Sequence, residues 1–184
     1  MKKILIPLLC LAAPTWAAES FVLDTGHTFP SFEIRHHNVS VMRGKFNRSQ
    51  GRVLLDPAGT SRIEVAVDAS SGDTGHDGLN QKLLGYNFFN TSQFPEIRFA
   101  SSDVVFKEGK PVSANGQLTL LGVTRPVTLE IRDYACTQQF LTRRPLCGAD
   151  VHTSIKRSDF GMNYGIPLIG DEVKLAIEVE GFRE

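Results

Sequence analysis

Residues 172–180 read EVKLAIEVE, and this stretch alternates between two kinds of side chain. Val173, Leu175, Ile177 and Val179 would share one face of an extended chain, and the other face would be mostly charged. Successive side chains of a β-strand point to opposite faces, so the pattern predicts a strand with one dry face and one wet face.

The same alternation recurs along most of the chain, for example at 61–68 (SRIEVAVD) and 126–132 (PVTLEIR). Turn signals such as DPAG at 56–59 separate the alternating runs. Many one-sided strands at short spacing predict an all-β fold, either an antiparallel barrel or a sandwich. The predicted strands are 21–24, 31–37, 44–55, 61–68, 96–106, 112–121, 126–135, 147–156 and 172–182.

One segment, 73–84 (DTGHDGLNQKLL), has the pattern of a short helix instead. Asp73 or Asp77 could cap its N-terminus, His76 would cap it or lie on its surface, and leucines supply a narrow apolar stripe. We expect this helix to serve either as a lid at the mouth of a barrel or as a plug over an open end.

The first 17 residues, MKKILIPLLCLAAPTWA, have a basic start, a short apolar run and small residues before Ala18. This pattern predicts a cleaved secretory signal peptide, because the apolar run is shorter than the roughly 20 residues that span a bilayer. A lipid anchor on Cys10 is the alternative, which the bulky Leu9 before it disfavours. We therefore expect a periplasmic protein with one domain, residues 18–184.

The charges of the predicted mature chain are nearly balanced. Removal of Lys2 and Lys3 leaves 18 basic residues against 20 acidic ones, with no basic block. A nucleic-acid partner attracted by charge is therefore not expected.

Two cysteines, Cys136 and Cys147, flank the sequence CTQQFLTRRPLC. In an exported protein this pair predicts a disulfide across a hairpin loop, and their spacing excludes a C-x-x-C redox site. A zinc site would need two further ligands, for which His152 is the only nearby candidate. We expect no metal.

The tripeptide Asp159-Phe160-Gly161 resembles the magnesium-binding corner of a protein kinase, but the other kinase motifs are missing. The glycines that follow do not form a phosphate-binding P-loop either. We interpret Asp159-Phe160-Gly161 as part of a glycine-rich crossing into the last strand, 172–182.

The histidines offer several readings. His36 shares the predicted inner face of Phe32 and Ile34, and His37 should point the other way. His36 could be a hydrogen-bonded core residue, a contact for a ligand's polar head or, least expected, a metal ligand. His152 lies near Ser154, Ser158 and Asp159 in the sequence, but no G-x-S-x-G elbow supports a catalytic triad.

The alternating pattern alone allows either a solid core or a barrel that holds one apolar ligand. Burial of a five-carbon prenyl unit yields about 4 kcal/mol before the costs of association, so a dry bore could bind such a chain without catalytic machinery.

Four segments together resemble the YceI-like family of exported bacterial proteins. They are FVLDTGHTFPSFEIRHHNVSVMRGKF (21–46), LLGYNFFNTSQFPEIRFAS (83–101), GQLTLLGVTRPVTLEI (116–131) and IKRSDFGMNYGIPLIGDEVKLAIEVEG (155–181). The resemblance implies a lipocalin-like antiparallel barrel of about eight strands with one short helix, whose bore takes a prenylated quinone, a polyprenyl phosphate or a similar amphiphile. It also suggests quinone carriage near a membrane quinone-using cytochrome, a response to high pH and a possible homodimer, and it requires no cofactor besides the bound lipid.

The resemblance also suggests which residues would contact the ligand. The head-group candidates are His36, Arg43, Arg157, Asp159 and Tyr164. The candidates that would line the bore are Phe32, Ile34, Phe88, Phe89, Phe99, Leu118, Leu120, Leu129, Ile131, Phe160, Met162, Leu175 and Ile177.

We therefore expect a non-catalytic carrier or sequestering protein for an isoprenoid lipid. The alternatives are a hydrolase that acts on an apolar amphiphile through His36 or His152, and a solid-core barrel that binds a partner.

Overall fold

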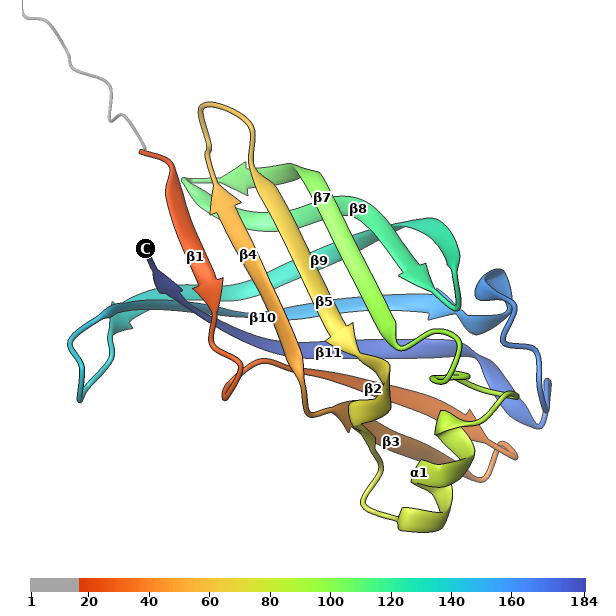
Figure 1. Cartoon of the computed structure of the whole chain (residues 1–184). Coiled ribbons are helices and arrows are strands. Elements are labelled where there is room, and N and C mark those ends of the chain that lie inside the picture. Colours follow the sequence, from red (N-terminus) through yellow and green to blue (C-terminus); the bar gives the residue numbers. More distant parts are fainter. Residues whose placement is uncertain (1–16) are drawn as a thin grey trace, which may run out of the picture.

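The computed structural model describes residues 17–184, so the predicted signal peptide lies almost entirely outside the described residues. The chain forms an antiparallel β-barrel with one α-helix (Figure 1). In chain order the elements are β1 (Glu19–Leu23), β2 (Phe29–His36), β3 (Ser40–Phe46), β4 (Ser49–Leu55), β5 (Arg62–Asp68), η1 (Ala69–Ser71), β6 (Gly72–Asp73), α1 (Asp77–Leu84), β7 (Glu96–Lys107), β8 (Lys110–Leu120), β9 (Val123–Gln138), β10 (Pro145–Lys156), η2 (Arg157–Phe160) and β11 (Ile169–Arg183).

Eight strands close the barrel. They follow the order β1-β4-β5-β7-β8-β9-β10-β11, and β11 pairs back onto β1. This arrangement confirms the predicted all-β antiparallel barrel of about eight strands with one short helix.

The last strand, β11, divides its free edge between the first two strands. Its C-terminal end pairs with β1, with Phe182 opposite Val22, and its N-terminal part pairs with β2, with Leu175 opposite Phe32. Thr28, between β1 and β2, fixes this junction: its hydroxyl donates to the Glu180 carbonyl, and its own carbonyl accepts a bond from Ser49 Oγ at 2.8 Å. The neighbour of β11 in the barrel wall is therefore β2 along its N-terminal part and β1 along its C-terminal end.

The predicted single strand over 44–55 is wrong, because the chain forms β3 and β4 with a break at Asn47 and Arg48. Here the chain leaves its pairing with β2 and begins its pairing with β1. The backbone amides of Asn47 and Arg48 donate to the carbonyl and hydroxyl oxygens of Ser71 in η1. Hydrogen bonds to η1 thus replace ladder bonds at the bend.

The helix is shorter than the predicted 73–84. Gly75 has a φ of +75°, which a right-handed helix cannot include, and Asp73 belongs to β6 opposite Lys45. The N-cap is His76, whose Nδ1 accepts a bond from the backbone amide of Leu79, and neither predicted aspartate takes this role.

His37 does not continue β2 as predicted. His37 and Asn38 adopt φ values of +51° and +54°, as in the two-residue turns that suit β-hairpins. The His37 ring therefore lies 4.4 Å from the His36 ring, centroid to centroid, instead of on the opposite face.

The disulfide between Cys136 and Cys147 is present, as predicted. The two residues are directly opposite each other on β9 and β10, near the turn that projects from one end of the barrel (Figure 1). Among the described residues, the helices are too short or too polar to be candidates for membrane spans.

Candidate functional site

The barrel encloses a long cavity of about 750 Å³. Its wall extends from Tyr134 and Cys147 at the disulfide end to Tyr86 and Tyr164 near α1. On β10 the lining runs from Cys147 to Ile155. At a rise of ~3.3 Å per residue and the usual strand tilt, this corresponds to about 20 Å along the barrel axis. The cavity rules out the solid-core alternative.

The cavity wall includes most of the residues predicted to line a bore. They are Phe32, Ile34, Phe88, Phe89, Phe99, Leu118, Leu120, Leu129, Ile131, Met162, Leu175 and Ile177. Phe160 is not part of the wall: it is 2% exposed and packs in a core cluster with Phe99 and Met162. That these residues contact a ligand stays a prediction.

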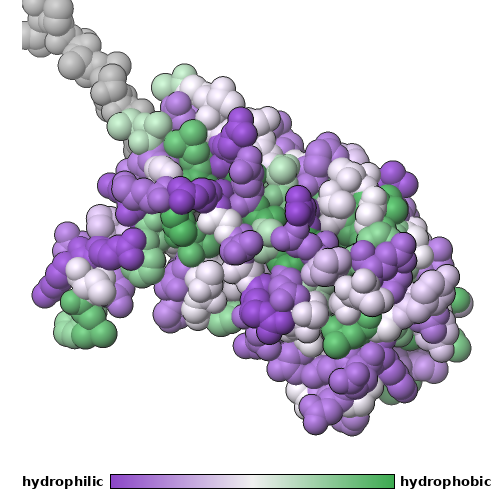
Figure 2. All heavy atoms as spheres, in the orientation of Figure 1, coloured by the Kyte–Doolittle hydropathy of each residue, from purple (hydrophilic) through white to green (hydrophobic). Residues whose placement is uncertain are grey.

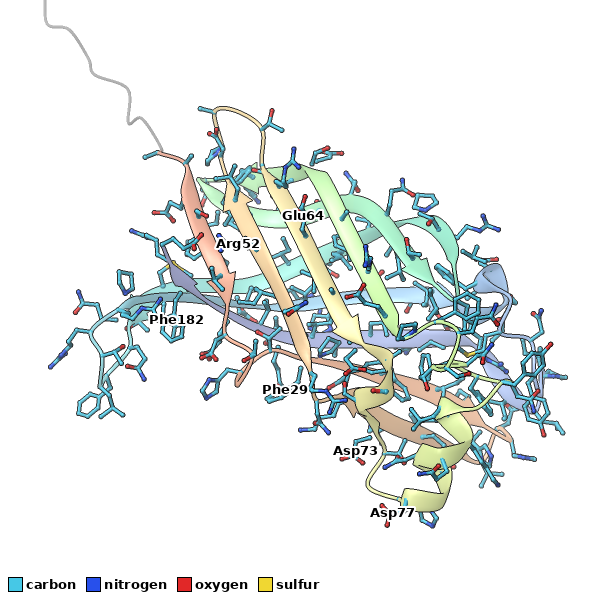
Figure 3. The ribbon with its side chains drawn as sticks, in the orientation of Figure 1. Phe29, Arg52, Glu64, Asp73, Asp77 and Phe182 are labelled. Carbon is cyan, nitrogen blue, oxygen red and sulfur yellow. A yellow bond between two sulfur atoms is a disulfide. The ribbon has the colours of Figure 1, made fainter. Side chains whose placement is uncertain are left out.

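Residues on β9 and β11 that point inward are only half-buried. Leu129 and Ile131 on β9, and Leu175 and Ile177 on β11, have this intermediate burial while their neighbours are exposed. In a solid core such side chains would be fully buried, so their partial exposure reflects the hollow interior. The outer face is polar: Arg52 of β4 lies directly opposite Glu64 of β5 (both labelled in Figure 3).

Two glycines make room for aromatic rings in the wall. Gly44 is directly opposite Phe32, and a Cβ there would overlap the Phe32 ring. Gly116 is directly opposite Ser101, two residues along β7 from Phe99, and a Cβ there would overlap the Phe99 ring. The two rings can therefore lie against the wall of the barrel, where they occupy less of the bore.

The exposed part of the lining lies at the α1 end, which we call the mouth. It consists of Arg43, Gln81, Lys82, Tyr86, Asn87 and Tyr164. Lys82 was not among the predicted head-group residues, because a lysine on the polar side of a predicted helix has the pattern of an ordinary solvated residue. Its place beside a cavity follows only from how α1 docks.

Three of the head-group candidates lie at or near the mouth. His36 lines the cavity, and no protein group in residues 17–184 hydrogen-bonds to its ring, which leaves its nitrogens accessible. Arg43 borders the cavity, but its Nε donates to Glu33 Oε1 at 2.7 Å. Tyr164 is half-exposed, and its ring packs edge-on against Phe88 at 5.5 Å.

The other two candidates have different surroundings. Arg157 is 1% exposed, and its guanidinium donates to three backbone carbonyls, those of Met162, Ile169 and Gly170, at 2.7–2.8 Å. Burial lowers its pKa from the ordinary value. Asp159 is exposed and outside the cavity lining. We therefore assign Arg157 a structural role in holding the loop before β11. Arg157 also lines the cavity, and contact of either residue with a head group stays a prediction.

The residues of the possible triad do not come together. His152 is opposite Glu130 and Ala176, on the outer face of β10, since its neighbour Val151 lines the cavity. Ser158 donates from both its backbone amide and its hydroxyl to the carboxylate of Asp171, at 2.9 and 2.8 Å. Within residues 17–184 no hydrogen bond joins His152 to a serine.

One cluster of metal-ligand residue types lies elsewhere, at the β1–β2 junction. Asp24, His27 and Glu180 place ligand atoms within 4.8 Å of one another. His27 Nδ1 and Asp24 Oδ2 are 2.8 Å apart, and this hydrogen bond raises the pKa of His27, with a smaller electrostatic contribution from Glu180. The hydrogen bond between His27 and Asp24 accounts for the closeness of these two side chains.

Comparisons with known proteins place the fold. Protein YceI of Escherichia coli is 31% identical over 193 residues, which covers 100% of both chains. The crystal structure of BcnA from Burkholderia cenocepacia has a TM-score of 0.71 at 23% identity, over 86% of this chain and 98% of that one. A polyisoprenoid binding domain from Saccharophagus degradans, implicated in plant cell wall breakdown, has a TM-score of 0.63 at 18% identity, over 89% and 98% of the two chains. The family description "YceI-like domain" matches residues 21–181, and this chain therefore belongs to the YceI-like family.

Proposed function

We propose that this protein binds and carries a long-chain isoprenoid lipid in its barrel, without catalysing a reaction on it, in the periplasm. The ligand would be a prenylated quinone, a polyprenyl phosphate or a similar amphiphile. The observation that carries this proposal is the elongated cavity of about 750 Å³, which has a mostly apolar wall and exposed polar residues at the α1 end.

The energetics of such binding are favourable. A chain of four prenyl units has about 20 carbons, which at ~0.8 kcal/mol per buried carbon contribute about 16 kcal/mol. Association costs of ~4–15 kcal/mol reduce this sum. Tight binding therefore depends more on a dry bore than on polar contacts along the prenyl chain.

The mouth offers groups for a polar head. Lys82 and the accessible ring of His36, which both line the cavity, could hold a phosphate or a quinone carbonyl. The similarity to the polyisoprenoid binding domain of Saccharophagus degradans supports the ligand class. If the ligand is a quinone, we propose a membrane cytochrome that uses quinones as the partner of the loaded carrier. A homodimer is a second proposed assembly.

Organic extraction followed by mass spectrometry tests the proposal. The protein is purified from the periplasm of a bacterium that expresses it, and the extract is searched for prenyl lipids. Ile177→Trp would place a large ring in the middle of the bore, and Glu178→Trp adds the same ring to the outer face as a matched control. We expect lipid in the wild type and in E178W, and loss of the lipid in I177W.

An empty wild-type protein, or I177W that folds and carries as much lipid as E178W, would contradict the proposal. Circular dichroism of both variants establishes that they fold. The hydrolase alternative predicts turnover of an amphiphile that is lost in His36→Ala, whereas a carrier leaves the extracted lipid chemically unchanged.

A further inference from the structure

Large apolar side chains are exposed around the mouth of the cavity. They come from the β2–β3 turn with the adjoining strand ends (35–43), the end of α1 with the loop after it (81–95), and the loop before β11 with the first two residues of that strand (161–170). We call these residues the rim: Val39 (86% exposed), Tyr86 (85%), Tyr164 (54%), Ile166 (37%) and Leu168 (60%). Exposed apolar residues that cluster in this way indicate an interaction surface.

The three rim segments form one continuous surface. The backbone amide of His37 donates to the carbonyl of Leu168 at 2.6 Å, which joins the β2–β3 turn to the loop before β11. The Tyr164 ring packs on Phe88, which joins that loop to the segment after α1. Figure 1 shows these three loops at the same end of the barrel, and hydrophobic patches are visible at that end in Figure 2.

The charge of the rim segments differs from that of the whole chain. Segments 35–43, 81–95 and 161–170 contain Arg35, Arg43 and Lys82 and no aspartate or glutamate, although acids and bases are equal in number overall. Glu33, on β2, pairs with Arg43. Arg35 and Lys82 are left without an ion-pair partner among the described residues.

We propose that the rim docks the barrel onto the surface of a lipid bilayer that contains anionic phospholipid. Separate loops with protruding aliphatic and tyrosine side chains fit a fluid interface, which needs no matching pocket, and the cations fit lipid phosphates. Tyr86 and Tyr164 belong to both the rim and the cavity lining. A ligand could therefore pass between bilayer and bore without crossing water, a role that rests on the proposed function.

The turn between β9 and β10 provides a matched comparison. Phe140 and Leu141 at its tip are 80% and 81% exposed, with Arg143 and Arg144 beside them. This turn lies at the disulfide end, and neither Phe140 nor Leu141 lines the cavity. Its two exposed apolar residues therefore match Val39 and Leu168 of the rim in number, but they lie at the wrong end of the bore for exchange.

Co-sedimentation with phosphatidylcholine vesicles, with and without phosphatidylglycerol, tests the docking. The variant Val39→Ser/Leu168→Ser removes rim residues that do not line the cavity, and Phe140→Ser/Leu141→Ser is the control. We expect the rim variant to bind vesicles at least tenfold more weakly while it keeps the lipid content of the wild type. Arg35→Gln should weaken binding to the anionic vesicles about fivefold, and the control should bind as the wild type does.

Three results would overturn the docking proposal: a wild type that binds neither kind of vesicle, a rim variant that binds as well as the wild type, or a loss of binding in the Phe140/Leu141 control alone. If the wild type binds vesicles through the rim but yields no lipid on extraction, the docking stands and the proposed carrier function fails. The two proposals can therefore fail separately.

Discussion

Replacement of Arg157 by methionine should destabilise the protein without a direct effect on ligand binding. The guanidinium is 1% exposed and holds the carbonyls of Met162, Ile169 and Gly170. Methionine fills a similar volume but donates no hydrogen bond, so three carbonyls would lose their partner. At roughly 1–3 kcal/mol for each buried polar group left unpaired, partly relieved by water, we expect a loss of about 3–6 kcal/mol. This is a large share of the ~5–15 kcal/mol that stabilises a typical domain.

Urea unfolding, followed by far-ultraviolet circular dichroism, measures this loss. Arg125→Met is the control. Arg125 is exposed, and its guanidinium donates to the carbonyls of Asp159 and Thr124 at the surface, so its effect should stay below about 1 kcal/mol. Arg157→Lys, which retains one charged donor group, should fall between the two. If R157M unfolds within 1 kcal/mol of the wild type yet loses its bound lipid, Arg157 contacts the head group and our structural assignment is wrong.

Three further predictions follow from other parts of the fold. Gly44→Ala should push the Phe32 ring into the bore, which lowers extracted lipid and costs about 1–3 kcal/mol in urea unfolding; unchanged lipid content would contradict this. Cys136→Ala/Cys147→Ala should lose roughly 3 kcal/mol of unfolding free energy, and a stability equal to that of the oxidised wild type would count against the chain-entropy explanation. The hydrogen bond to Asp24 raises the pKa of His27. The bond therefore stabilises the fold fully when the pH is below the pKa of His27 in the unfolded chain, about 6.5, and this stabilisation disappears as the pH rises through the pKa of His27 in the folded protein. His27→Gln should remove this component from melting temperatures measured across that range, and identical pH profiles for variant and wild type would exclude it.

Strand alternation predicted the barrel well because each strand has one apolar and one polar face. The sequence could not show that the interior is hollow, since Leu129 and Ile177 have the same pattern whether they face a packed core or a cavity. The partial burial of both residues depends on how far the opposite wall lies from them.

Errors arose where an interaction distant in sequence decides the local structure. The strand expected over 44–55 breaks because Asn47 and Arg48 bond to Ser71, more than twenty residues away. The sequence did not indicate the structural role of Arg157 either, because the carbonyls that it bonds belong to the loop that follows. Lys82 was not predicted as a head-group residue, because only the docking of α1 brings it to the mouth.

The divided edge of β11 has a consequence for how the chain folds. This strand joins β10 to both β1 and β2, and it pairs Phe21 with Arg183, near the two ends of the described chain. The barrel therefore cannot close until the last residues have been made, and its contacts are far apart in sequence, which predicts folding in milliseconds to seconds. Until then β1, β2 and β10 would expose unpaired edges that other chains could join. A chain exported with its N-terminus first would be most prone to aggregation just before its final strand arrives.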